Sequence, residues 1–248
     1  MSGHNKWSTI KRKKGAIDAK RSKIFSKIIK EINIAVKESG PSPDTNPRLR
    51  MAIQNAKGVN MPKDNISRAI SKASADGSNY TETTFEGYAP GGVAIFVECL
   101  TDNNNRTVSN VRSIFNKRGG NMGTNGSLSF LFERKGVFTI PKDNIKSPED
   151  FELEVIDAGV EDIEDEGDVF MLYCPMEVFG KVQKKLEEIK IDAENAELRR
   201  IPNDMKTLDN ESAQKVLKLI DEFEDDDDVQ NVWHNLEVTD ELLNSMDN

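Results

Sequence analysis

The sequence predicts a multidomain protein of the α and α+β class, with an N-terminal helical bundle followed by two α/β domains. Up to about residue 75, apolar residues recur at helical spacing. Beyond that point, strand and helix patterns alternate. The charge changes at the same place: residues 1–75 contain 17 Lys and Arg against 5 Asp and Glu, the remainder contains 17 against 38, and the whole chain carries −9.

Residues 1–78 are the predicted helical domain. Apolar and basic residues lie on opposite faces of a helix between Ser22 and Glu38. A second helix begins at Asn46-Pro47, a capping residue followed by proline, and ends near Gly58. A third begins around Pro62. On the first helix, the expected apolar face is Phe25, Ile28, Ile29, Ile32 and Val36, and the expected basic face is Lys23, Lys27, Lys30 and Lys37.

A second domain begins at residue 79 with a predicted β-hairpin around Pro90-Gly91-Gly92. Cys99 and Cys174 each lie inside an expected apolar strand, which is typical of small core residues in a reducing compartment. The other expected elements up to residue 133 are strands Thr83–Tyr88 and Val93–Leu100, helix Asn105–Lys117, a flexible glycine loop Gly119–Gly126 and strand Ser127–Phe132.

Residues 134–203 show the order βαββαβ, which is that of the ferredoxin-like unit. A helix at Ser212–Glu224 and a strand at Val229–Val238 then have no local partners, so we expect them to return to the sheet of residues 80–132. The ferredoxin-like unit is then an insertion in a domain made of residues 79–133 and 204–248. Its expected elements are Val137–Ile140, Pro148–Ala158, Asp162–Glu164, Val169–Tyr173, Met176–Glu188 and Ala193–Ile201.

The basic N-terminal segment is the strongest functional feature of the sequence. Four cations at 11–14 follow Trp7, and cations hold phosphates while an aromatic ring can stack on a base. A solvated tail is the alternative, and Trp7 can equally pack on the bundle, but further cations at 48–72 extend the field and favour nucleic acid. Charge alone does not distinguish DNA from RNA. The predicted binding residues are Lys6, Trp7, Lys11, Arg12, Lys13, Lys14, Lys20, Arg21, Lys23, Lys27, Lys30, Arg48, Arg50 and Arg106.

Three other segments have alternative interpretations. The polar run Thr101–Thr107 precedes a helix, where it can bind an anion or simply cap the helix. The Gly119–Gly126 loop can let the backbone approach RNA or be a mobile connection, and it lacks the ending of a phosphate-binding P-loop. The acidic run Glu224–Asp228 matches no calcium loop and is expected to be a solvated turn.

The sequence offers little to support catalysis. His4 and His234 are the only histidines, and neither has metal-ligand spacing. We therefore expect no enzymatic activity, cofactor, metal or small-molecule substrate. No apolar run approaches the roughly 20 residues of a membrane helix, so we expect no membrane partner. The two lone cysteines indicate a reducing compartment, so we expect a cytoplasmic protein.

Taken together, the motifs resemble the YebC/PmpR family, whose mitochondrial relatives are translational activators of cytochrome oxidase. The resemblance covers nearly the whole chain and is strongest through residue 136. The motifs that support it are Gly3-His4, Lys6-Trp7, Asp18-Ala-Lys-Arg21, Asn46-Pro-Arg-Leu-Arg50, Ala52-Ile53, Ala56-Lys57, Asn60-Met-Pro62, Asp64-Asn-Ile66, Arg68-Ala-Ile70, Glu86-Gly-Tyr88, Pro90-Gly-Gly-Val-Ala94, Leu100-Thr-Asp-Asn103, Asn105-Arg-Thr107, Gly119-Gly120 and Gly126-Ser127.

The resemblance implies three domains, one α/β domain inserted in another, and a non-enzymatic cytoplasmic protein. The family is usually described as DNA-binding transcriptional regulators, and some members are implicated in assisting ribosomes that stall at proline-rich stretches. The sequence shows no recognition helix of the helix-turn-helix type, which favours sequence-tolerant binding of RNA. Two functions stay open: a transcriptional regulator that binds DNA, and a ribosome-associated translation factor that binds ribosomal or transfer RNA.

Overall fold

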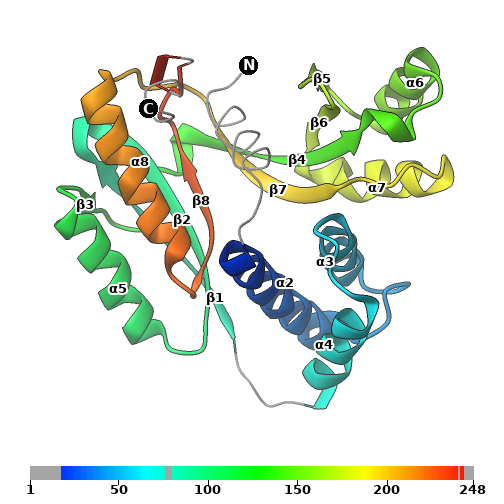
Figure 1. The fold of residues 1–248 in the computed structure, drawn as a ribbon, viewed down its shortest axis with the longest axis horizontal. Helices are drawn as coiled ribbons and strands as arrows, with labels where there is room; N and C mark the ends of the chain where they lie inside the picture. Colours follow the sequence, from blue (N-terminus) through cyan, green and yellow to red (C-terminus); the bar gives the residue numbers. More distant parts are fainter. Residues whose placement is uncertain (1–17, 76–79, 240, 243–248) are drawn as a thin grey trace. The chain divides into compact units, whose positions relative to one another are not determined.

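The computed structural model describes residues 18–75, 80–239 and 241–242, with side chains from Arg21 onward. These residues divide into two compact units (Figure 1). One unit contains residues 80–133 and 200–242, and the other contains residues 21–75 and 134–199. Each unit has its own hydrophobic core.

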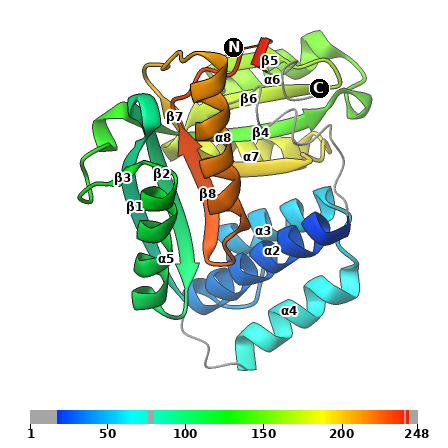
Figure 2. The ribbon, with the colours of Figure 1, turned by 60° about the vertical axis from the view of Figure 1, so that its left-hand side comes forward.

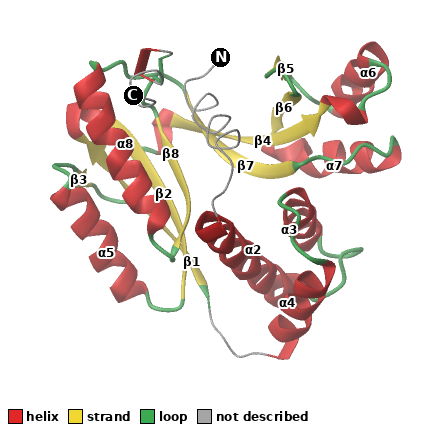
Figure 3. Cartoon of the chain, viewed as in Figure 1, coloured by secondary structure: helices red, strands yellow, loops and turns green. Residues whose placement is uncertain are grey.

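The N-terminal segment is helical, as predicted, and Figure 3 shows no strand in its described part. It consists of α2 (Asp18–Ser39), α3 (Pro47–Gly58) and α4 (Lys63–Ala75). Asn46 begins α3, because its Oδ1 accepts a hydrogen bond from the Leu49 N–H at 3.0 Å. The Asn46 Nδ2 donates to the Ala35 carbonyl at 2.6 Å, so the same side chain ties α3 to α2.

The core of this segment confirms the predicted apolar face of α2, with one correction. Ile32 and Val36 are buried, and Phe25 and Ile28 pack against the same cluster. Ile29 is exposed. At about 100° per residue it lies roughly 60° from Ile32, at the margin of the apolar stripe, where the helix surface turns outward.

The first unit is a four-stranded sheet with two helices on one face, as Figures 1 and 2 show. Its strands lie in the order β3-β1-β2-β8. Phe115 and Phe223 meet edge to face at 4.8 Å between ring centroids, which joins the two helices over the sheet. The elements are β1 (Thr81–Ala89), β2 (Val93–Thr101), α5 (Asn104–Lys117), β3 (Asn121–Met122), α8 (Asn210–Asp225) and β8 (Val229–His234).

The last strand returns to this sheet, as its lack of local partners predicted. β8 pairs antiparallel with β2, so that Val97 lies opposite Val232. β8 ends at His234 rather than at Val238, and beyond it only a single parallel bridge joins Lys206 to Leu236.

The strand predicted at Ser127–Phe132 is wrong. This stretch is a turn followed by a 3₁₀ helix at Ser129–Leu131, and the next strand begins at Phe132. The physical reason is Glu86, whose carboxylate accepts hydrogen bonds from the N–H groups of Gly126 and Leu128. A side chain therefore takes the backbone donors that a strand would offer to its neighbour.

The ferredoxin-like unit is present, with the strand order β5-β6-β4-β7. Met176–Val178 forms a 3₁₀ turn, so the second helix of this unit begins three residues later than predicted. The fold class is thereby confirmed, while the exact domain boundaries stay a prediction. The elements are β4 (Phe132–Pro141), α6 (Pro148–Ala158), β5 (Asp162–Asp165), β6 (Val169–Pro175), α7 (Phe179–Glu188) and β7 (Asn195–Pro202).

Helix α3 is attached to this ferredoxin-like sheet through Asn55. The Asn55 Nδ2 donates to the Ala196 carbonyl at 2.9 Å, and its Oδ1 accepts from the Ala196 N–H at 2.8 Å. Gly58 packs so closely that a Cβ there would lie 1.7 Å from the Glu194 carbonyl oxygen. These contacts explain why the helical segment and the ferredoxin-like segment share one compact unit.

Candidate nucleic-acid interface

The predicted basic face of α2 is only partly open. Lys23, Lys27 and Lys30 are half-buried, and each has an interaction within the protein. Ile34, which lies on the same side of the helix by its spacing, is buried. The predicted residues that lie outside the described side chains are Lys6, Trp7, Lys11, Arg12, Lys13, Lys14 and Lys20.

Three predicted arginines of the helical segment have partners within it. The Arg21 guanidinium donates to the Asn60 carbonyl at 3.3 Å. Arg48 forms ion pairs with Glu31 and Glu38, and Arg50 donates to the carbonyls of Pro43 and Asp44. These contacts hold the guanidinium groups in place. Arg50 thereby helps to fix the loop between α2 and α3, and Arg21 binds the connection between α3 and α4.

Other cations of the helical segment are exposed and have no ion pair among the described residues. Arg68 and Lys72 lie one turn apart on α4, on the side away from its buried Ile66 and Ala73. The set consists of Lys37, Lys57, Lys63, Arg68 and Lys72. Sequence reasoning included most of them in the basic field but placed none in the candidate set, because a sequence does not show which cations lack a nearby carboxylate.

Arg106 is paired with carboxylates, although 47% of its side chain is exposed. Its Nη2 lies 2.8 Å from the Asp228 Oδ2, and the same nitrogen lies 2.8 Å from the Asp102 Oδ1. The hydrogen bond to Asp228, followed by the one to Asp102, raises the pKa of the guanidinium. Asp228 is buried, so the expectation that residues 224–228 form a solvated turn is wrong at this position.

The polar run at 101–107 is a capping junction in the structure. The Asn103 side chain accepts from the Arg106 N–H and begins α5. The Thr107 hydroxyl lies 2.9 Å from the Asp228 Oδ2 and 2.7 Å from the Thr101 hydroxyl. The polar groups therefore bind one another and Asp228, which joins the β2–α5 corner to the α8–β8 turn.

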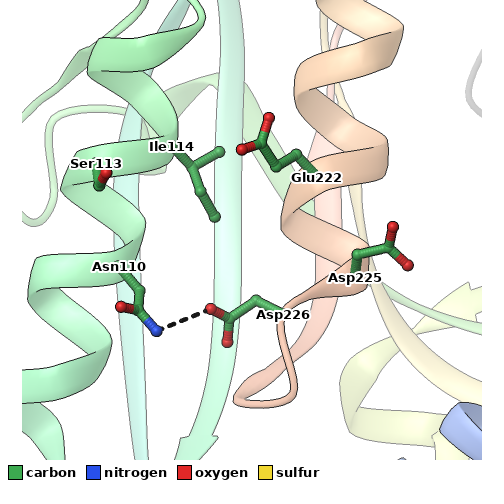
Figure 4. Close-up of a pocket in the computed structure, with 6 residues that line it drawn as sticks. All are labelled: Asn110, Ser113, Ile114, Glu222, Asp225 and Asp226. Atoms are coloured by element: carbon green, nitrogen blue, oxygen red, sulfur yellow. Dashed lines mark hydrogen bonds between the residues drawn. The ribbon is translucent and has the colours of Figure 1, made fainter.

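A hollow between α5 and α8 is acidic (Figure 4). The Asn110 Nδ2 donates to the Asp226 Oδ2 at 3.1 Å, and Glu222 binds Lys117 and Arg118. The hydrogen bonds from Lys117 and then Arg118 lower the pKa of Glu222. Three of the six residues that line the hollow have carboxylates, which repel a phosphate. No metal-binding cluster of His, Cys, Asp and Glu occurs among the residues that the structure describes.

The glycine-rich loop is held at several points. Besides the two bonds to the Glu86 carboxylate, the Gly123 N–H donates to the Glu86 carbonyl at 2.7 Å. The loop is therefore fixed to β1, and the idea that it serves only as a mobile connection does not fit its contacts. Cys99 and Cys174 are buried and form no disulfide, as their positions in apolar strands predicted. Within the described part of the chain, no helix is long and apolar enough to cross a membrane.

These features define a multidomain α+β protein whose helical segment has exposed cations without an ion pair among the residues that the structure describes. Comparison with known proteins identifies the family. Residues 5–76 match the TACO1/YebC protein N-terminal domain, and residues 80–236 match the TACO1/YebC second and third domain. The chain belongs to the TACO1/YebC family.

Relatives match over nearly their whole lengths. A "Probable transcriptional regulatory protein" from Geobacter sp. (strain M21) is 52% identical over 248 residues, covering 99% of this chain and 100% of the relative. One of the same description from Amoebophilus asiaticus (strain 5a2) is 52% identical, covering 95% and 98%. The crystal structure of a conserved hypothetical protein from Aquifex aeolicus has a TM-score of 0.82 and 44% identity, covering 92% of this chain and 95% of that one.

Proposed function

We propose that this protein is a non-enzymatic regulator of transcription that acts in the cytoplasm by binding DNA. Its relatives carry the description of probable transcriptional regulatory proteins, which supports this class of function. Duplex DNA is a polyanion, and a protein binds it chiefly by neutralising phosphates with Lys and Arg.

The observation that carries the proposal is the separation of charge along the chain. Residues 18–75 contain 12 Lys and Arg against 5 Asp and Glu, and residues 1–17 contain five cations and no acid. Several of the cations on α2–α4 are exposed without an ion pair among the described residues. A field of this sign attracts phosphate, whereas the acidic remainder of the chain repels it.

Within this proposal the candidate residues differ in role. The cations at positions 6, 11–14 and 20 contact phosphates, and Trp7 stacks on a base or packs on the helices. Arg21, Lys23, Lys27 and Lys30 also take part but contribute less, because each already has an interaction within the protein. Arg48, Arg50 and Arg106 contribute less to affinity, because protein groups already hold their guanidinium groups. Lys57, Lys63, Arg68 and Lys72 join the interface through their exposed ammonium and guanidinium groups.

The absence of catalysis is also a proposal. The acidic hollow between α5 and α8 has no histidine or cysteine among its six lining residues, and Glu222 there is neutralised by two cations. Ser113 carries the one hydroxyl among the six lining residues, and none of them is a histidine that could take its proton. Turnover that disappears on changing one of these residues would contradict the proposal.

The experiment that tests the function is crosslinking of the full chain in cells, followed by sequencing of both the DNA and the RNA recovered with it. A DNA-binding regulator yields discrete DNA sites, and it discriminates such a site from random DNA by about 4–10 kcal/mol near physiological salt. Recovery of ribosomal or transfer RNA in place of DNA sites overturns the transcriptional proposal and establishes the alternative, a ribosome-associated factor that relieves stalling at proline-rich stretches.

A further inference from the structure

Phe130 is the most exposed large apolar side chain of the described residues, with 70% of its surface accessible. Its backbone is nevertheless fixed on the C-terminal side. The Asn203 Nδ2 donates to the Phe130 carbonyl at 2.9 Å, and the Asn203 N–H donates to the Leu131 carbonyl at 2.9 Å. The exposed ring is therefore not at the end of a loose loop.

The N-terminal side of the ring is fixed as well. The buried Glu86 carboxylate accepts from the N–H groups of Gly126, at 2.7 Å, and of Leu128. Leu128 and Phe132, two residues before and after Phe130, are both buried in the cluster that contains Phe96. Because its neighbours are anchored inward, the backbone around the exposed Phe130 ring is already ordered. A ligand that binds the ring therefore pays little further conformational entropy.

The loop that carries the ring contains polar residues but no charged residue. None of the thirteen residues from Gly119 to Leu131 is charged, in a chain of which 31% is charged. A second exposed ring belongs to Tyr88, which is 41% accessible. Tyr88 lies on the same face of β1 as Glu86, and its backbone position pairs with Asn121 of the loop. A Cβ at Gly120 would lie 2.7 Å from the Tyr88 carbonyl oxygen, so the loop lies directly against this strand.

We propose that the loop 119–131 is a second nucleic-acid contact, at which Phe130, assisted by Tyr88, stacks on unpaired bases. The inference rests on the proposed nucleic-acid binding and deepens it by naming single-stranded segments as its ligand. Every base has a π face, so an exposed ring binds it without regard to sequence. The amides and hydroxyls of the loop can bond to base edges, and the loop has no carboxylate to oppose a phosphate.

Helix α6 provides a matched control. Leu153 and Ile156 are similarly exposed, at 66% and 52%, but they lie among carboxylates. The acidic residues of α6 are Glu149, Asp150, Glu152, Glu154 and Asp157. This surface repels nucleic acid, so an alanine there removes exposed apolar area without removing a base contact.

The test is fluorescence anisotropy of the full chain with a mixed-sequence single-stranded DNA, and with the same strand annealed to its complement. Phe130→Ala is expected to weaken single-strand binding about 5- to 150-fold, equivalent to roughly 1–3 kcal/mol for one stacked base. Duplex binding and Tm stay unchanged. Phe130→Leu, which keeps apolar area but has no π face, behaves like Phe130→Ala, whereas Phe130→Trp and Leu153→Ala bind the single strand as well as the wild type does.

Several outcomes overturn the inference. They are undiminished single-strand binding by Phe130→Ala, full binding by Phe130→Leu, and equal losses for single strand and duplex. A Phe130→Ala variant that loses only a protein partner shows that the ring docks to protein instead. If the wild-type chain binds no nucleic acid, the proposed function fails at once. If it binds and Phe130→Ala binds equally, only the present inference fails.

Discussion

Two groups of cations in this protein have opposite surroundings. Arg68 and Lys72 on α4 are exposed and have no ion pair among the described residues. Lys117 and Arg118, at the end of α5, both bind Glu222. The difference teaches that a count of Lys and Arg predicts a polyanion-binding region only where no carboxylates neutralise them. We propose the helical segment as that region of this chain.

The same contrast applies to the polar motif at 101–107. Arg106 resembles a phosphate-binding residue in sequence, but Asp228 and Asp102 already hold its guanidinium group. The charge of Arg106 therefore stabilises the β2–α5 corner through these ion pairs. The predictions that follow probe the contrast between open and neutralised cations, beginning with the largest expected effect.

The largest effect is expected from the four cations at 11–14, which lie outside the described residues. Each phosphate contact contributes roughly 0.9 to the slope of log affinity against log salt on duplex DNA, and about 0.7 on a single strand. Changing all four to alanine should flatten that slope by about two to four units. The measurement is a salt titration of binding, with Tm as the control for folding. An unchanged slope would show that this run is not part of the interface.

Changing Asp228, which joins the β2–α5 corner to the α8–β8 turn, should affect stability rather than binding. Asp228→Ala removes the acceptor for the buried Thr101 and Thr107 hydroxyls and the main partner of Arg106. We expect a loss of about 3 kcal/mol in the free energy of unfolding, measured by urea denaturation. Affinity per folded molecule should not change. A variant of wild-type stability that binds DNA differently would place this junction in the interface instead.

A smaller effect, on the pH dependence of stability, is expected from Glu222→Gln. Lys117 and Arg118 hold the pKa of this carboxyl below its ordinary value in the folded state. Its contribution to stability is present above the ordinary pKa and is lost as the pH falls through the lowered one. The free energy of unfolding of Glu222→Gln should therefore decline less on acidification than that of the wild type. Parallel pH profiles for the two proteins would contradict this coupling.

Local signals were enough to predict most of the fold. Asn46-Pro47 marks the start of α3, and the βαββαβ order is readable from residues 134–203. The strand at Val229 had no local partner, which predicted its return to β2. The strand predicted at 127–132 was wrong because Glu86, some forty residues earlier, binds the backbone of this stretch. No local pattern reveals such a contact.

The candidate site was less predictable for the same reason. Arg106 and Asp228 are 122 residues apart, so their ion pair cannot be read from spacing. The availability of Arg68 and Lys72 likewise depends on which carboxylates the fold brings near. The exposure of Phe130 follows from the anchoring of Leu128 and Phe132, and the sequence analysis did not single out this residue.

The most direct test of the central claim compares two double variants of the full chain by salt titration of duplex DNA binding. Arg68→Gln with Lys72→Gln removes two open cations, and Lys117→Gln with Arg118→Gln removes two that Glu222 neutralises. The first pair should flatten the slope of log affinity against log salt by about one to two units, and the second pair should leave it unchanged. Equal slopes for the two variants, or a larger change in the second, would contradict the claim that the unpaired cations of the helical segment bind the nucleic acid.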